Sequence, residues 1–350
     1  MKVAILNDKL DAGGAEKVIV NMANLLYAKG VEVIVVLFLH PAVLDTLLHP
    51  QIPVVYLYRK SRFDMKAMLL LKKVVMESDI VHVHSRYNLR YYMIAKWTTG
   101  ILKPKTVFHE HIPVLRIDAF TKMILRSVDA YLAVLQSMCS WVKEVVHLKA
   151  TRVFYLPNTI NSPKRIIPQQ SAGTKIIMVG NIWHFKNQLF ALDVINALPE
   201  DYTLDIYGAV NNEGYHLQLL KKINALKLSD RVKIIQGVSE VYSVLGKYNL
   251  AIHTSQKETG PLVLLEYMHA GLPFISYKTG DVISNIQQNI PEGVMESFDI
   301  QKWSYAIQLL STNEEVRISM RQKMRTIIKE QYSEDSYFKA LDGIYQVILN

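Results

Sequence analysis

Two glutamates, Glu258 and Glu266, enclose an apolar segment in the stretch KETGPLVLLEYMHAGLPF at residues 257–274. A carboxylate accepts two hydrogen bonds at once and gains from its charge, so two of them at a fixed spacing suit the binding of hydroxyl groups. The segment between them predicts a helix from about residue 261, which places Glu258 on the preceding loop and Glu266 about one and a half turns inside. The plain alternative is a surface loop that leads into a core helix and carries two unrelated glutamates.

The first turn of that helix is a second candidate binding element. Gly260 and Pro261 predict the helix start, with Pro261 at its favoured first position, and Gly271 predicts a left-handed C-cap. The backbone of a first helical turn favours an anion, so the run from Gly260 through Leu262 to Val263 is expected to bind phosphate groups.

Two further turns join a strand end to a group that can bind an anion. In IIMVGNIWHFKNQLFAL (176–192), Lys186 lies between a strand and a helix and can sit over a diphosphate as a point charge. In NDKLDAGGAEKVIVNMANLL (7–26), the pair Gly13-Gly14 lies at a similar turn, where glycines let backbone amides approach a ligand closely. A solvated lysine and an ordinary tight turn are the respective alternatives.

The elements that must position these residues alternate between strands and helices. Near-continuous Val/Ile runs separated by helices of about 10–15 residues indicate parallel sheets that are covered on both faces. Strands are expected at 3–7, 31–38, 53–57, 80–84, 106–110, 130–134, 153–156, 175–179, 203–208, 232–237, 250–253 and 274–277. We therefore expect an α/β protein of two Rossmann-like doubly wound domains, 1–157 and 173–330, joined near 157–172. A C-terminal helix follows at 331–350, and whether it packs back on the N-terminal domain is left open.

Composition and missing motifs exclude several classes of protein. Half of the 350 residues are hydrophobic, which indicates a folded protein, and no stretch reaches the roughly 18 apolar residues of a membrane span. Cys139 is the only cysteine, so an internal disulfide is excluded and a reducing cytoplasm is favoured. No G-x-G-x-x-G, P-loop, H-E-x-x-H or D-x-D pattern is present, which argues against a dinucleotide oxidoreductase and a P-loop enzyme. We expect no cofactor and no metal.

The net charge of +9 is confined to the first half of the chain. Residues 1–160 hold 21 Lys and Arg against 12 Asp and Glu, whereas 161–350 hold 19 of each. A basic face on one domain implies an anionic partner. No nucleic-acid-binding module accompanies the charge, so nucleic acid is the weaker explanation.

The segment YRKSRFDMKAMLLLKKVVM (58–76) indicates that the anionic partner is a membrane. It predicts a helix from Arg62 in which Arg62, Lys66 and Lys73 form a basic stripe. The adjoining apolar face is expected to hold Phe63, Ala67, Leu70, Leu71 and Val74. Such a helix favours docking on an anionic bilayer, and a packed helix with a solvated cationic edge is the alternative.

Taken in their order, these motifs resemble the retaining glycosyltransferases of family 4 (glycosyl transferase group 1), which have the two-domain GT-B fold. The resemblance covers essentially the whole chain, and its GGAE and EH variants are most similar to bacterial enzymes that build surface polysaccharides or lipid-linked oligosaccharides. It rests on GGAE (13–16), EH (110–111), LPNTI (156–160), VGNIWHFKNQ (179–188), DRVKIIQG (230–237) and the E-x7-E pattern (258–266).

The resemblance implies that a nucleotide-sugar, expected to be a UDP-sugar, binds the C-terminal domain. The acceptor, expected to be a lipid-linked glycan, binds the N-terminal domain, and a cleft between the two domains closes for transfer. Glu266 would accept hydrogen bonds from the ribose, Glu258 would contact the donor sugar, and Lys186 would neutralise the diphosphate leaving group. Transfer would retain the anomeric configuration without a metal, because the departing phosphate oxygen takes the acceptor's proton.

Three further positions have roles that this resemblance implies. His111 would contact the donor sugar, although His109 lies on the same side of the strand and is the alternative. Gly14 would let the donor phosphates or the acceptor approach its loop. Asn181 stands where many family members have an arginine, which leaves part of the diphosphate clamp unaccounted for.

The resemblance also implies a hexosyl- or N-acetylhexosaminyltransferase in the cytoplasm, on the inner face of the cell membrane. A non-catalytic GT-B partner subunit and a sugar-nucleotide epimerase are the alternatives. The sequence leaves open the donor sugar, the base, the linkage formed and the oligomeric state.

Overall fold

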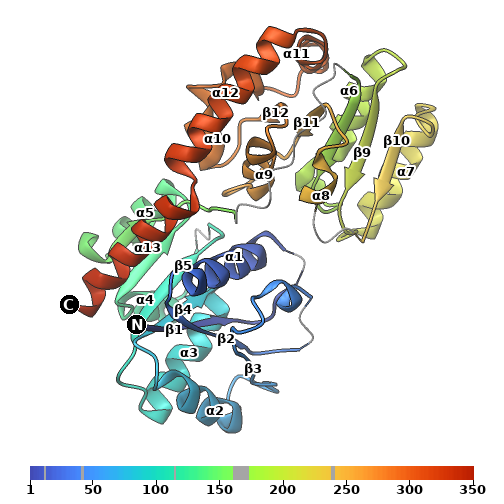
Figure 1. Cartoon of the computed structure of the whole chain (residues 1–350). Coiled ribbons are helices and arrows are strands. Elements are labelled where there is room, and N and C mark those ends of the chain that lie inside the picture. Colours follow the sequence, from blue (N-terminus) through green and yellow to red (C-terminus); the bar gives the residue numbers. More distant parts are fainter. Residues whose placement is uncertain (12, 41–42, 114–115, 161–172, 238–240) are drawn as a thin grey trace. The chain divides into compact units, whose positions relative to one another are not determined.

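The computed structural model describes residues 1–350 except 12, 41–42, 114–115, 161–172 and 238–240 (Figure 1). The chain divides into two compact units, Met1–Asn161 with Glu334–Asn350 and Ser162–Ser333. The predicted linker at 157–172 lies mostly outside the described residues.

The N-terminal unit is built on a seven-stranded, wholly parallel sheet with the order β3-β2-β1-β4-β5-β6-β7. Its strands are β1 (Lys2–Asn7), β2 (Glu32–Leu37), β3 (Val54–Tyr56), β4 (Ile80–His84), β5 (Lys105–Glu110), β6 (Ala130–Ala133) and β7 (Val153–Tyr155). Its α-helices are α1 (Gly14–Ala28), α2 (Met65–Val75), α3 (Arg86–Thr99), α4 (Ala119–Arg126), α5 (Gln136–Trp141) and α13 (Glu334–Leu349). A π-helical turn at Val142–Val146 and 3-10 turns at Asp45–Leu47 and Ala150–Arg152 complete the unit.

The C-terminal unit has a six-stranded parallel sheet with the order β10-β9-β8-β11-β12-β13. Its strands are β8 (Lys175–Val179), β9 (Thr203–Tyr207), β10 (Val232–Ile235), β11 (Leu250–His253), β12 (Phe274–Tyr277) and β13 (Val294–Met295). Its α-helices are α6 (Gln188–Ala197), α7 (Glu213–Ala225), α8 (Tyr242–Leu245), α9 (Leu262–Ala270), α10 (Asp281–Gln287), α11 (Ile300–Thr312) and α12 (Glu314–Gln331). Two 3-10 turns are at His184–Lys186 and Pro291–Gly293.

The core explains why the strands have so few polar residues. In β1 every residue from Val3 to Leu6 is fully buried, and alternate side chains enter two separate hydrophobic clusters on the two faces of the sheet. A strand that is covered on both faces can place apolar residues at consecutive positions.

The last helix, α13, packs on the N-terminal unit although the chain reaches it from the C-terminal unit (Figure 1). Leu341 and Tyr345 are fully buried in the same cluster as Val3 and Ile5 of β1. The Tyr345 hydroxyl shares a hydrogen bond of 2.6 Å with Nδ1 of His82 on β4. The C-terminal segment is thus part of the N-terminal core.

Candidate functional site

Both sheets place their candidate residues where the strand order reverses. In the C-terminal sheet the reversal lies between β8 and β11, and Lys186 and Glu258 follow the carboxyl ends of those two strands. In the N-terminal sheet it lies between β1 and β4, and Gly14 follows β1. Open α/β sheets bind ligands in the crevice at such reversals.

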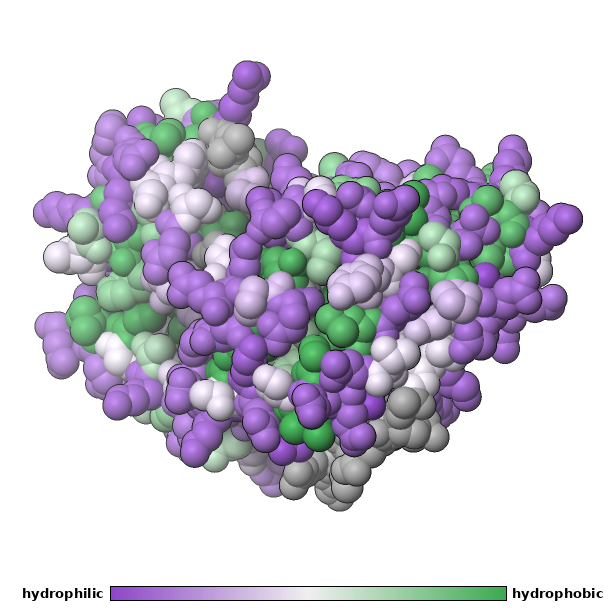
Figure 2. All heavy atoms as spheres, turned by 90° about the horizontal axis from the view of Figure 1, so that it is seen from above, coloured by the Kyte–Doolittle hydropathy of each residue, from purple (hydrophilic) through white to green (hydrophobic). Residues whose placement is uncertain are grey.

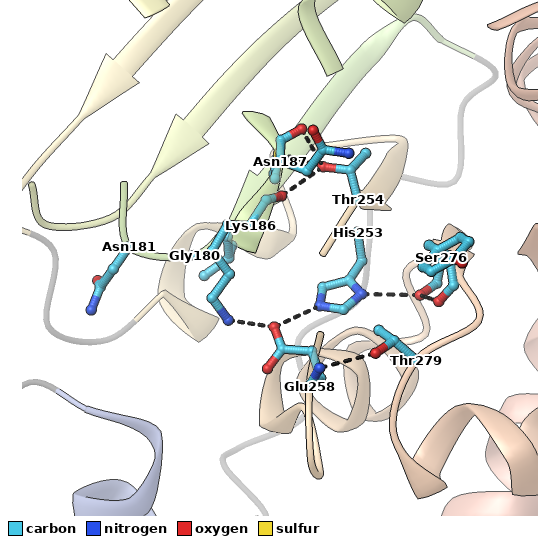
Figure 3. A network of polar contacts seen from close by, with 12 residues as sticks. Gly180, Asn181, Lys186, Asn187, His253, Thr254, Glu258, Ser276 and Thr279 are labelled. Carbon is cyan, nitrogen blue, oxygen red and sulfur yellow. Dashed lines mark hydrogen bonds and ion pairs between the residues drawn. The ribbon is translucent and has the colours of Figure 1, made fainter. Parts of the chain in front are cut away.

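Lys186, Glu258 and His253 form one polar network in the C-terminal unit (Figure 3). Lys186 Nζ lies 2.5 Å from Glu258 Oε1, and His253 Nε2 lies 3.5 Å from the same oxygen. His253 is buried at the end of β11, where its Nδ1 lies 3.0 Å from Ser276 Oγ. Two strands and two loops thus converge on a single carboxylate.

Glu258 is held in its ionised form by this network. Burial raises the pKa of its carboxyl group, but the His253 contact and the positive charge of Lys186 outweigh burial and lower the pKa to about 2. Burial lowers the pKa of His253, although Glu258 opposes that shift. A carboxylate in this state is a good acceptor of hydrogen bonds from hydroxyl groups and a poor proton acceptor.

The loops that carry the two charged groups are tied together by backbone contacts. Thr254 Oγ1 donates hydrogen bonds to the carbonyls of Lys186 and Asn187, at 2.9 and 3.1 Å. The amide of Glu258 donates to Thr279 Oγ1 at 2.9 Å. The site is therefore preorganised before any ligand binds.

Gly280 is required next to Glu258 for two reasons. It has a positive φ of +78°, and a Cβ atom there would lie 2.6 Å from the carbonyl oxygen of Thr259. A side chain at this position would displace the loop that carries Glu258.

Glu266 lies half-buried on α9, in the second turn, as predicted from its spacing. The neighbouring Tyr267 is fully buried, and its hydroxyl accepts a hydrogen bond of 3.0 Å from the amide of Val179 at the end of β8. This bond fixes α9, and with it Glu266, against the strand that precedes Lys186.

The predicted start of α9 was wrong by one residue. Pro261 is the N-cap with an extended ψ of 103°, and the helix begins at Leu262, since Leu264 donates its amide hydrogen bond to the Pro261 carbonyl. Gly271 adopts the left-handed conformation that was predicted, with a φ of 68°. Gly260, Leu262 and Val263 thus flank or form the first turn, beside the loop that carries Glu258.

Asn181 does not join the Lys186–Glu258 network, as Figure 3 shows. Its Oδ1 accepts a hydrogen bond of 3.1 Å from the amide of Ala209, the residue after Gly208. A Cβ on Gly208 would lie 2.2 Å from the Gly180 carbonyl oxygen, so the two loops touch through their backbones. Asn181 therefore supports the loop that leads to Lys186.

The N-terminal unit holds four histidines at the carboxyl ends of β4 and β5. His82 and His84 on β4 and His109 on β5 are buried, whereas His111, just after β5, is half-buried. His111 Nε2 lies 2.8 Å from His84 Nδ1, and burial lowers the pKa of His111 to about 4. Of the two histidines between which the sequence could not decide, His111 is the one that solvent reaches.

The buried histidines could also hold a metal ion. One ring nitrogen from each of His82, His84 and His109 lies within 4.8 Å of the others. Burial keeps the pKa values of all three low, so their nitrogens stay neutral, as a metal requires.

An ion pair that the sequence did not suggest lies beside these histidines. Arg86, at the start of α3, binds both carboxylate oxygens of the buried Glu110, and its Nη2 lies 2.9 Å from Oε2. Tyr131 donates a further hydrogen bond to Glu110. Burial raises the pKa of Glu110, and Arg86 opposes that shift. The pair fixes the end of β5, from which His111 extends.

Gly14 is the first residue of α1 and is exposed. Its φ is not positive, and a Cβ there would meet nothing within 4 Å. Neither backbone strain nor packing within the N-terminal unit explains the glycine.

The predicted basic helix needs correction in both its start and its apolar face. The helix α2 begins at Met65, so Arg62 precedes it, because the carboxylate of Asp64 caps the helix by accepting the Ala67 amide at 3.2 Å. The buried residues are Ala67, Met68, Leu71 and Val75, whereas Phe63 and Leu70 are exposed. The stripe residues Arg62, Lys66 and Lys73 are exposed, as expected.

His253, Thr254 and Thr279 are the site residues that the sequence analysis missed. His253 and Thr254 come at the carboxyl end of β11, so the rule that ligands bind beyond strand ends could have found them. Thr279 follows the carboxyl end of β12 and could have been found by the same rule, but its contact with Glu258 depends on how two loops meet.

Two α/β units, each built on a parallel sheet with polar groups at the reversal of its strand order, are the architecture of the GT-B fold. Residues 163–330 match the family model of glycosyl transferases group 1, and residues 12–162 match that of glycosyltransferase family 4. The chain belongs to this glycosyltransferase family.

Individual relatives agree with this assignment. The chain is 24% identical to an uncharacterized glycosyltransferase of Haemophilus influenzae over 95% of its own length and 96% of the relative's. It is 23% identical to the capsular polysaccharide biosynthesis glycosyltransferase CapH of Staphylococcus aureus, over 66% of each chain. The structure of Anabaena HepE in complex with UDP and glucose has the same fold, with a TM-score of 0.82, 17% identity and 99% of each chain covered.

Proposed function

We propose that the protein is a retaining glycosyltransferase that moves a hexose or N-acetylhexosamine from a UDP-sugar to a lipid-linked glycan. The product would be an intermediate of a bacterial surface polysaccharide. The Lys186–Glu258–His253 network beyond β8 and β11 is the observation that carries this proposal. HepE, which has the same fold, was crystallised with UDP-glucose, and CapH is a capsular polysaccharide enzyme.

Each part of the donor has a partner in the C-terminal unit in this proposal. The ionised Glu258 accepts hydrogen bonds from the sugar hydroxyls near the reacting carbon, and Glu266 accepts those of the ribose. Lys186 neutralises the diphosphate, together with Gly260 and Pro261 before α9 and Leu262 and Val263 at its start. Because Glu258 is a poor base, the departing phosphate oxygen takes the acceptor's proton.

The transfer itself uses no metal in this proposal. A divalent cation usually shields a leaving diphosphate, and here Lys186 and the helix start supply that positive charge. In the N-terminal unit, His111 contacts the transferred sugar and Gly14 leaves room for a ligand close to the backbone.

Arg62, Lys66 and Lys73 dock the N-terminal unit on the anionic inner face of the cell membrane, where the lipid-linked acceptor lies. No helix in the described part of the chain is long and apolar enough to cross a bilayer. The face drawn in Figure 2 is mostly hydrophilic with scattered small hydrophobic patches. The proposed attachment rests on the exposed side chains of Arg62, Lys66 and Lys73.

Purified full-length protein should be incubated with UDP- and GDP-sugars, lipid-linked acceptors and EDTA, and release of UDP or GDP should be measured. The anomeric configuration of the product is read by NMR. Transfer with retention supports the proposal, and epimerised donor without acceptor would identify an epimerase instead. A lack of turnover with every donor would favour the non-catalytic subunit.

A further inference from the structure

A groove of about 460 Å³ lies along α3 on the N-terminal unit, where α3 packs beside α2 and α4 (Figure 1). Tyr87, Tyr91, Ile94 and Trp97 line it at intervals of three or four residues, so they share one face of the helix. Phe120 of α4 and the segment before α2 form the rest of the wall. At 1.5 Å per residue, about 15 Å of helix separates Tyr87 from Trp97. The volume is in the range of ligand sites, about 300–1,000 Å³.

The walls of the groove are aromatic and remain open to solvent. Phe63, Tyr87 and Trp97 are 71%, 46% and 47% exposed. A saccharide needs a hydrogen-bond partner for most of its hydroxyl groups, and the lining between Tyr91 and Trp97 offers few. Exposed aromatic surface of this kind suits a hydrocarbon chain.

Cationic groups lie along this apolar groove, and Arg90 stacks on Phe120, which contacts Trp97. Arg59, Arg62 and Arg90 belong to its lining. Asp8 lies 3.5 Å from Arg59, and Asp118 lies 3.1 Å from Arg90, so two of the three charges are partly neutralised. Arg62 is exposed and forms no ion pair with any residue that the structure describes. The groove therefore keeps a net positive charge, which suits a phosphate next to the hydrocarbon chain.

One end of the groove lies at the edge of the sheet that also carries His111. Arg59 follows β3, and Tyr87 opens α3 directly after β4, so both lie at the carboxyl edge of the sheet. His111 lies at the same edge, after β5. Because α3 runs antiparallel to the strands, the groove leads from this edge toward Trp97 in the last turn of the helix.

We propose that this groove binds the acceptor lipid, with its hydrocarbon chain along α3 and its phosphate at Arg59 and Arg62. This inference rests on the proposed function, since it assumes a lipid-linked acceptor. The exposed apolar residues Met65 and Leu69 of α2 then continue the groove toward the bilayer, beside Lys66. The groove thus selects the acceptor by its lipid rather than by its sugar.

Binding of farnesyl diphosphate to the full-length protein tests the groove directly, by calorimetry, with farnesol and inorganic diphosphate as comparison ligands. We expect Trp97→Ala, Phe63→Ala and Arg62→Gln each to weaken farnesyl diphosphate binding at least about tenfold, as loss of one desolvated contact does. Tyr305→Ala removes an aromatic side chain that is 70% exposed on the other unit, and it should bind like wild type. Unchanged thermal stabilisation by UDP shows that each variant is folded.

Two results would refute the proposal that the groove binds lipid. One is equal binding of farnesyl diphosphate to all variants, and the other is binding of inorganic diphosphate as tightly as farnesyl diphosphate. Kinetics separate this failure from failure of the proposed function. If the wild type transfers sugar to a lipid-linked acceptor and Trp97→Ala does so with an unchanged KM, the groove is wrong and the function stands. If the wild type binds farnesyl diphosphate but turns over no donor, the function is wrong.

Discussion

Replacement of Lys186 by alanine tests the donor site most directly. The lysine side chain is 28% exposed and its Nζ lies 2.5 Å from Glu258 Oε1, so the charge is fixed at the strand end where the diphosphate is proposed to bind. Two unit charges about 4 Å apart interact with about 4 kcal/mol at an effective dielectric constant of about 20. That figure is an upper limit for catalysis, because the diphosphate is already charged before the sugar departs and only the charge that develops afterwards counts.

Loss of one preorganised group of this kind usually lowers kcat about 100- to 1,000-fold, which is about 2.7–4 kcal/mol. We therefore expect a loss of this size in Lys186→Ala, with UDP release in the presence of lipid-linked acceptor as the assay. Glu258→Gln and the variant that carries both substitutions complete a double-mutant cycle. Since the two side chains touch, their effects should not add.

Lys222→Ala is the matched control. Lys222 is also 28% exposed, and its Nζ lies 2.6 Å from Asp193 in the same unit. A partly exposed pair of this kind contributes about 0–1 kcal/mol to stability, and its loss should leave kcat unchanged. If Lys186→Ala and Lys222→Ala transfer sugar at the same rate, Lys186 does not act on the leaving group.

Three further predictions concern stability and packing. The pKa of Glu258 in the folded protein is lowered to about 2, so the ionised carboxylate adds about 3 kcal/mol to the free energy of unfolding. This contribution is complete above about pH 4.5 and is lost as the pH falls toward 2. Urea unfolding of wild type and Glu258→Gln across this range should converge at the acid end, and parallel curves would refute the shift. Gly14→Ala should keep the melting temperature but lower transfer, whereas Gly208→Ala, whose Cβ would overlap a backbone carbonyl, should lower the melting temperature itself. Tyr345→Phe should cost about 1–3 kcal/mol of unfolding free energy in denaturant titrations, because it leaves buried His82 without its partner, and an unchanged midpoint would contradict this.

Most of the fold could be predicted from local pattern because its strands are buried on both faces. The bounds of β4, β8, β11 and β12 agree with the predicted strands to the residue. The strand β13 was missed, since Val294–Met295 is too short to show any periodicity. The start of α2 was misplaced although the sequence held the signal, an aspartate three residues before Ala67 that caps the helix.

The buried face of α2 could not be predicted in the same way. The helix holds apolar residues at most of its positions, so periodicity alone does not choose among Met68, Leu69 and Leu70. Packing beside α3 decides the matter, because Met68 contacts Thr98 and is buried while Leu69 and Leu70 face outward. Of the residues left outside, Leu69 is one that continues the proposed lipid groove.

In the candidate site, too, local sequence predicts which residues take part, whereas contacts between residues far apart in the chain cannot be predicted from it. Glu258 and Lys186 could be named because each follows a strand, and Glu266 because of its spacing from Glu258 inside the next helix. The ionisation of Glu258 could not, because it depends on His253, which arrives from β11, and on Lys186, which is 72 residues away in the chain.

This ionisation bears directly on the proposed mechanism. A group whose pKa is about 2 is charged throughout the physiological range and gains almost nothing by taking a proton, so Glu258 cannot serve as an efficient general base. His253 is buried behind it, with Nδ1 beside Ser276, and does not offer a second base to the acceptor hydroxyl. If the acceptor's proton leaves on the departing phosphate, the charge that Lys186 must stabilise falls as transfer proceeds. Lys186 then acts mainly while the sugar–phosphate bond is breaking, and its replacement should lower kcat more than it raises the KM for the donor.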